Sequence, residues 1–191
     1  QDAIDGIPAC DTVHDMQAAR GTSLSPDSGP TTHTSVRLFA IVAVLTLAVD
    51  QVSKYLAVER LQNRAPVELI PNVLSLAFYR NAGAALGTGT GFTVVLSIIA
   101  IVVCVAVVRI ATRLRDRGWA IGLGLLLAGA LGNLADRLFR QPSPFKGHVV
   151  DFIDYGVFIG NVADIALTLA AIVIVWRTWR GVSIDGTREA R

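Results

Sequence analysis

Four long apolar runs constrain the fold of this chain more than any other feature of its sequence. They cover residues 36–58, 91–110, 119–139 and 155–176. A helix needs about 20 predominantly apolar residues to cross the roughly 30 Å hydrocarbon core of a bilayer. The chain is 52% hydrophobic and 17% charged, whereas soluble domains carry about 25% charged residues. The runs therefore predict an all-α membrane protein with four transmembrane helices.

The sequence outside the runs predicts the topology. Residues 1–35 are rich in Ser, Thr, Pro and Asp without periodicity, which predicts a disordered N-terminal tail. Arginines are concentrated in the link 109–118 and near the carboxyl end, and cytoplasmic loops carry such an excess. We therefore expect a membrane domain over residues 36–178, with the N-terminal tail, the link 109–118 and the tail 179–191 in the cytoplasm.

The link between the first two runs carries a strand signal. The stretch "VLSLAFYRN" (73–81) alternates large apolar residues with small or polar ones, the period-2 pattern of a strand with one apolar face. Pro66 and Pro71 punctuate the chain before it. We expect a small extracytoplasmic β-sheet within about residues 62–88.

Ionisable residues also occur inside the runs, where each costs at least a few kcal/mol. Asp50 and Lys54 are one helical turn apart and can pair on one face. They could form an interfacial pair with Lys54 snorkelling outward, or brace a site made by later segments. Asp136 and Arg137 are adjacent and cannot pair well on a helix, so each needs a partner elsewhere. Asp136 could brace two helices, and Arg137 could hold a carboxylate from the outer loop or the fourth run.

Two further carboxylates lie near the start of the fourth run. Asp164 has no basic residue nearby in its own segment, and Asp151 lies just ahead of that segment. Alone, Asp151 could be a solvated loop acid. A turn near Tyr155–Gly156 would instead let the two carboxylates face each other at the membrane edge.

Such a pair suits amide hydrolysis. Two carboxylates in a partly desolvated site cannot both ionise easily, so one keeps a proton near neutral pH. The ionised acid can take a proton from water while the other polarises the scissile carbonyl and later protonates the leaving group. Ser53 and Ser97 have no evident His partner, and no Cys or His spacing indicates a metal. We expect neither metal nor cofactor.

Five short motifs occur in order along the chain: "DQVSKY" (50–55), "NAGAALG" (81–87), "GALGNLADR" (129–137), "HVVDFI" (148–153) and "NVAD" (161–164). Together they resemble the lipoprotein signal peptidase family (signal peptidase II), four-helix aspartyl proteases of bacterial membranes. The resemblance covers roughly residues 36–178. It implies that Asp151 and Asp164 are the catalytic pair and that Asp136 is structural. It also implies substrate-binding or supporting roles for Asp50, Lys54, Asn81, Gly83, Asn133, Arg137 and Asn161.

The chain departs from the family pattern at three positions. The family usually has Phe at Leu86, commonly an aromatic residue at Gly160, and often a small polar residue at Ile165. These departures leave the two aspartates in place and concern the shape of the pocket.

The implied activity is intramembrane aspartyl endopeptidase cleavage of diacylglyceryl-modified prolipoproteins, just before the lipidated cysteine. The expected partners are these substrates and membrane lipids, without nucleic acid, and we expect a monomer. The expected location is the bacterial cytoplasmic membrane, with the site at the outer-leaflet face.

Two alternatives rest on the same ionisable residues. A proton- or ion-coupled transporter would use Asp50, Asp136, Arg137 and Asp164 within the spans. The polar residues cluster toward one side, however, and no broken-helix repeat is evident. In a non-catalytic membrane scaffold, all of these acids would be structural braces.

Overall fold

The computed structural model describes residues 32–83, 91–142 and 144–188. The four long helices in it are α2 (Thr32–Leu61), α3 (Gly91–Ala111), α4 (Arg117–Phe139) and α5 (Val162–Trp179). Its strands are β1 (Val67–Ile70), β2 (Leu74–Asn81), β3 (Val149–Asp154) and β4 (Ile159–Gly160). All four helices are long and apolar enough to cross a membrane. The predicted fold class, four transmembrane helices with a small sheet, is confirmed.

The predicted N-terminal tail is only partly described. Residues 32–35 belong to the first turn of α2, so the predicted tail extends too far by four residues. The remaining residues of that tail, and Leu86 of the "NAGAALG" motif, lie outside the described residues.

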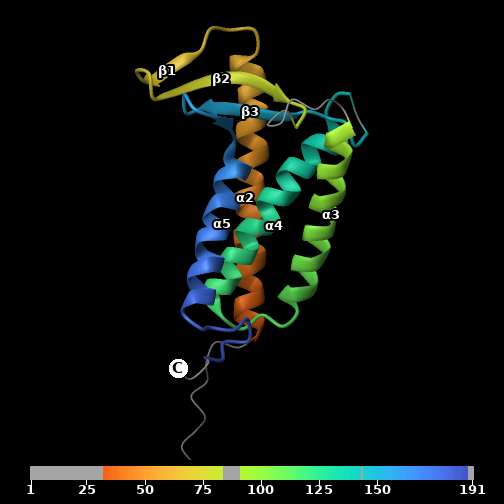
Figure 1. The fold of residues 1–191 in the computed structure, drawn as a ribbon, viewed down its shortest axis with the longest axis vertical. Coiled ribbons are helices and arrows are strands. Elements are labelled where there is room, and N and C mark those ends of the chain that lie inside the picture. The colour runs from red at the N-terminus through yellow and green to blue at the C-terminus, as the bar shows by residue number, and fades with distance from the viewer. Residues whose placement is uncertain (1–31, 84–90, 143, 189–191) are drawn as a thin grey trace, which may run out of the picture.

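Helix α4 is the central helix of the bundle and packs against α2, α3 and α5 (Figure 1). Glycines allow the close approach of its neighbours. A Cβ on Gly129 would lie 2.7 Å from the backbone oxygen of Ala163 in α5, and one on Gly132 would clash with the Asp50 carboxylate of α2. The two glycines therefore let α4 lie tightly against both helices at the level of the polar motifs.

The outward faces of the helices remain apolar. Large side chains such as Val44, Val102, Ile172 and Val175 are exposed. Soluble monomers rarely expose contiguous apolar surface on this scale, whereas acyl chains solvate such faces. The exposed residues are therefore those expected to contact lipid.

The sheet caps one end of the bundle, opposite the C-terminal end of α5 (Figure 1). It is antiparallel with the order β1-β2-β3-β4. The observed sheet is larger than the predicted one, because it also contains β3 and β4, which come from the link between α4 and α5. Isolated two-stranded hairpins are marginally stable, and pairing with β3 gives β2 a second neighbour.

Helix α5 begins at Val162 and not at Tyr155, which corrects the predicted start of the fourth span. Residues 155–158 form the turn between β3 and β4, where Gly156 has φ +76°. The Asn161 side chain then accepts from the Asp164 N–H, and the Asp164 side chain accepts from the Asn161 N–H. This reciprocal capping box starts the helix at that point.

Candidate active site

The two predicted catalytic carboxylates come from different elements. Asp151 projects from β3 and is 3% exposed, whereas Asp164 lies in the first turn of α5 and is half-buried. Asn81 Nδ2 donates to Asp151 Oδ2 at 2.9 Å, and Asn161 Nδ2 donates to Asp151 Oδ1 at 2.6 Å. Both oxygens of Asp151 are therefore held by neutral amides.

Asp164 is held in the same way. Asn133 Nδ2 donates to its Oδ1 at 2.9 Å, and the Asn161 backbone N–H donates to its Oδ2 at 3.1 Å. Asn161 thus contacts both aspartates, one through its side chain and one through its backbone. The fold thus brings Asp151 and Asp164 into contact with the same residue.

Each of the three asparagines is oriented by a donor to its own side-chain oxygen. The Gly83 N–H donates to Asn81 Oδ1 at 2.9 Å, and the Asp164 N–H donates to Asn161 Oδ1 at 3.1 Å. Lys54 Nζ donates to Asn133 Oδ1 at 3.1 Å. Because each amide oxygen is occupied in this way, the amide nitrogens face the carboxylates.

A second polar cluster lies directly against this one. Lys54 Nζ is 3.0 Å from Asp50 Oδ2 and 2.9 Å from Asp136 Oδ2, and Lys54 is 0% exposed. Full burial rules out the snorkelling alternative for Lys54. The Ala163 N–H donates to Asp50 Oδ1 at 2.8 Å, which ties α2 to the first turn of α5.

Asp136 connects the helices to the sheet. Its Oδ1 accepts from Arg140 Nε at 2.5 Å, and its Oδ2 accepts from the Val150 N–H at 3.2 Å. Val150 precedes Asp151, so Asp136 fixes the backbone next to the buried carboxylate.

Arg137 does not make the ion pair that its position suggested. Its Nη1 donates to the Asn133 carbonyl of its own helix at 3.0 Å, and among the described residues its buried Nε has no hydrogen-bond partner. Within the described ranges it forms no salt bridge with Asp151 or Asp164.

Burial raises the pKa of Asp151, which lies outside the membrane-spanning helices. Desolvation is the largest cause, and the negative charge of Asp164 acts in the same direction. The hydrogen bonds from Asn81 and Asn161 and the charge of Lys54 oppose the shift without cancelling it. Asp151 therefore holds a proton to higher pH than an ordinary aspartate.

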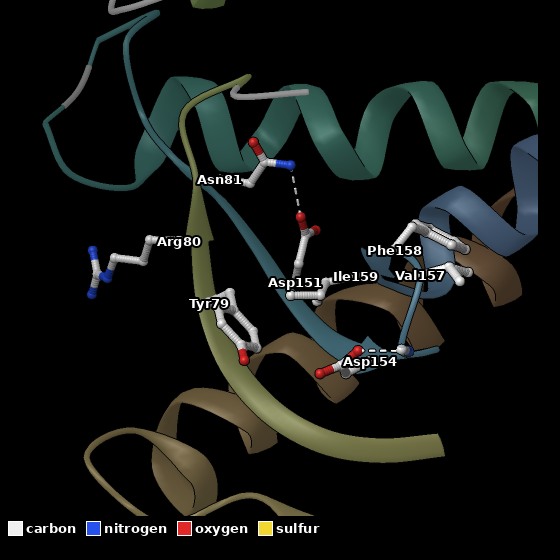
Figure 2. Close-up of a pocket in the computed structure, with 9 residues that line it drawn as sticks. Tyr79, Arg80, Asn81, Asp151, Asp154, Val157, Phe158 and Ile159 are labelled. Atoms are coloured by element: carbon white, nitrogen blue, oxygen red, sulfur yellow. Dashed lines mark hydrogen bonds between the residues drawn. The ribbon is translucent and has the colours of Figure 1, made fainter. Parts of the chain in front are cut away.

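A cavity of about 570 Å³ opens beside Asp151 (Figure 2). Its polar lining includes Tyr79, Asn81 and Asp154, and its apolar lining includes Val157 and Phe158. Asp154 Oδ1 accepts from the Gly156 N–H at 2.8 Å, so this carboxylate is used in the turn.

Sequence reasoning missed the part played by the sheet. Asp151 lies in a strand, with Tyr79 opposite it and Asn81 opposite Val149. Asn81 and Asp151 are diagonal neighbours on one face of the sheet, within reach of each other. The apolar, β-branched run around Asp151 in "HVVDFI" was the available signal for this strand.

The fold and site together define a class: a four-helix membrane protein with two buried or half-buried carboxylates at the end of the bundle that carries the sheet. The sequence profile of the family described as "Signal peptidase (SPase) II" matches residues 42–180. The chain belongs to this family of proteases.

Individual relatives agree with this assignment. The chain is 45% identical to a lipoprotein signal peptidase of Rhodococcus jostii, covering 84% of this chain and 81% of that one. It is 48% identical to a lipoprotein signal peptidase of Streptomyces coelicolor, covering 78% and 74%.

Two solved structures, both described as bacterial membrane enzymes, share the fold. One has a TM-score of 0.66 at 31% identity and covers 80% of this chain and 94% of the other. The second has a TM-score of 0.64 at 33% identity and covers 73% and 91%.

Proposed function

We propose that this protein is an intramembrane aspartyl endopeptidase that removes signal peptides from diacylglyceryl-modified prolipoproteins, cleaving just before the lipidated cysteine. One observation carries the proposal. Asn161 bonds to both Asp151 and Asp164, so two carboxylates from separate elements meet at one residue, and Asp151 also lines the adjoining cavity. The names of the relatives support the class of substrate.

In the proposed reaction Asp151 carries the shared proton, because burial raises its pKa, and Asp164 acts as the base. Asp164 takes a proton from water as the water oxygen attacks the scissile carbonyl carbon. Asp151 donates a hydrogen bond to the developing oxyanion. The carbon–nitrogen bond then breaks as Asp151 gives its proton to the leaving nitrogen, and the proton that Asp164 took from water leaves the pair singly protonated again. The products are a signal peptide with a new carboxylate and a lipidated cysteine with a free amine.

The surrounding residues divide into two groups by their contacts. Asn81, Asn133 and Asn161 position the carboxylates, with Gly83 orienting Asn81. The ion-paired group of Asp50, Lys54 and Asp136 braces the helices that carry them. Arg137, whose buried Nε lacks a partner, would offer its donors to oxygen atoms of the substrate.

The proposed topology places both termini in the cytoplasm and the sheet at the outer-leaflet face, in a monomer. The arginines of the 109–118 link support it, because they lie at the end of the bundle opposite the sheet (Figure 1). The diacylglyceryl group of a substrate would then lie in the outer leaflet, next to the cavity.

The test is cleavage of a purified diacylglyceryl-modified prolipoprotein, followed by the shift in size on a gel. Asp151→Asn and Asp164→Asn should each lower the rate by at least about 10³-fold, as loss of an acid or base does. Asp154→Asn is the matched control: Asp154 lies in the same strand and cavity lining, and its variant should retain near-normal activity.

Near-normal cleavage by a folded Asp151→Asn or Asp164→Asn variant would contradict the proposed mechanism. Family membership favours a peptidase over the transporter alternative. Ion flux in liposomes that depends on Asp164 would reopen that alternative.

A further inference from the structure

The Phe158 ring lies over the backbone of Gly160. A Cβ placed on Gly160 would lie 2.8 Å from Phe158 Cε2 and 3.1 Å from Asp164 Oδ2. The first distance is closer than real Cβ contacts, so a larger residue at position 160 would displace the ring. The Phe158 ring and the Asp164 carboxylate therefore occupy the space that a side chain at position 160 would need.

The β3–β4 turn holds this ring in a defined place. Phe158 stacks on Tyr155 with ring centroids 4.8 Å apart and an interplanar angle of 13°. The Tyr155 N–H donates to the Phe158 carbonyl at 2.9 Å, and Asp154 closes the start of the turn through Gly156. Despite these contacts Phe158 remains 54% exposed. The ring is thus oriented by its turn but is not part of a buried core.

Phe158 and Asp151 line the same cavity. Phe158 and Val157 lie on one side of Asp151 in Figure 2, and Tyr79 and Arg80 lie on the other. An apolar wall thus stands next to the carboxylates, where a peptide bond must lie for hydrolysis. A side chain adjoining that bond would be limited in size by the ring.

We propose that Phe158 is a specificity-determining residue, which limits the size of the substrate side chain adjoining the scissile bond. Gly160 permits this role because it leaves room for the ring. The inference rests on the proposed function, since it concerns the substrate of the same site. Beyond that function, the inference names the residue that selects among substrates.

The test compares two lipidated prolipoproteins that differ in the residue before the modified cysteine, Ala in one and Leu in the other. In the wild-type enzyme the ratio of kcat/KM for Leu to that for Ala should be low. Phe158→Ala should raise this ratio about tenfold, the scale on which a hydrophobic pocket discriminates by size. Phe139→Ala, which removes an exposed aromatic ring outside the cavity lining, should leave the ratio unchanged.

Gly160→Ala gives an independent readout, because its Cβ would push the ring aside. It should shift the ratio in the same direction as Phe158→Ala. Residues in contact give non-additive effects, so the double variant should shift the ratio no further than Phe158→Ala alone. If Phe158→Ala does not fold, Phe158→Leu keeps an apolar side chain and should raise the ratio by a smaller factor.

A Leu-to-Ala ratio within twofold of wild type in a folded Phe158 variant would overturn the inference. So would a fully additive further shift in the Phe158/Gly160 double variant. These outcomes are distinct from failure of the proposed function, which would appear as undiminished cleavage of the Ala substrate by Asp151→Asn.

Discussion

Two groups of buried carboxylates lie side by side in this protein, and their partners differ. Asp50 and Asp136 share the ammonium group of Lys54, at 3.0 and 2.9 Å. Asp151 and Asp164 accept hydrogen bonds from asparagine side chains and a backbone N–H. The first group is therefore compensated by a full charge, and the second by neutral donors.

The difference in partners indicates different roles for the two groups, one structural and one chemical. A carboxylate that contacts a buried cation has its charge compensated directly, which suits a brace between helices. Neutral amides offset less of the desolvation cost of a charged carboxylate than a cation does. For Asp151, desolvation accordingly raises the pKa. Such a group holds its proton to higher pH than an ordinary aspartate, which suits a role in acid–base catalysis.

Removal of the shared cation should have the largest effect on stability. Lys54→Met leaves Asp50 and Asp136 buried without their common partner, and breaking a buried pair costs about 3–5 kcal/mol. Thermal unfolding in detergent should show a much lower midpoint for this variant. Asp50→Asn is the control, because Lys54 then keeps Asp136 and the loss should be smaller. Equal losses in the two variants would show that charge compensation is not what the cluster provides.

Loss of a neutral donor should instead affect activity. Ser is a good helix N-cap, so Asn161→Ser can retain the start of α5 while it removes the Nδ2 donor to Asp151. We expect an activity loss of about 100-fold, the lower range for loss of one electrostatic donor, with an unfolding midpoint close to wild type. Parallel losses of stability and activity would contradict the separation of the two groups.

The raised pKa of Asp151 predicts a pH dependence of stability. The folded protein binds this proton more tightly than the unfolded chain, whose Asp titrates near about 3.9. The contribution is therefore fully present below about pH 4 and is lost as the pH rises through the raised pKa. Relative to wild type, Asp151→Asn should gain stability between pH 4 and 8. A constant difference in unfolding free energy across that range would argue against the raised pKa.

The smallest effect is expected at the edge of the ion-paired group. The Arg140 side chain that contacts Asp136 is 26% exposed, and we expect this partly solvated pair to contribute about 1 kcal/mol, the upper end of the range for surface pairs. Arg140→Gln should lower the unfolding free energy by no more than that, because Lys54 still compensates Asp136. A loss as large as that of Lys54→Met would show that Arg140 is an essential part of the brace.

Much of the fold could be predicted because its signals are local. The four apolar runs gave the helices, and the alternation in residues 73–81 gave β2. The start of α5 was placed too early, since the apolar stretch continues through a hairpin turn that hydropathy does not distinguish from helix. The strand β3 was missed for a similar reason, because a short apolar run has no period of its own until a partner is known.

The sequence by itself determined the membrane fold and which acids required explanation, because burying charge in an apolar segment is costly wherever it occurs. Tertiary structure alone decided the partner of each acid. It paired Lys54 with Asp50 and Asp136, left Arg137 without a salt bridge among the described residues, and brought Asn81 from β2 to Asp151. It also placed the Phe158 ring over Gly160. Most of these contacts join segments that are distant in sequence, and the contact of Phe158 with Gly160 depends on the conformation of a turn. They are therefore decided by how the helices and strands pack.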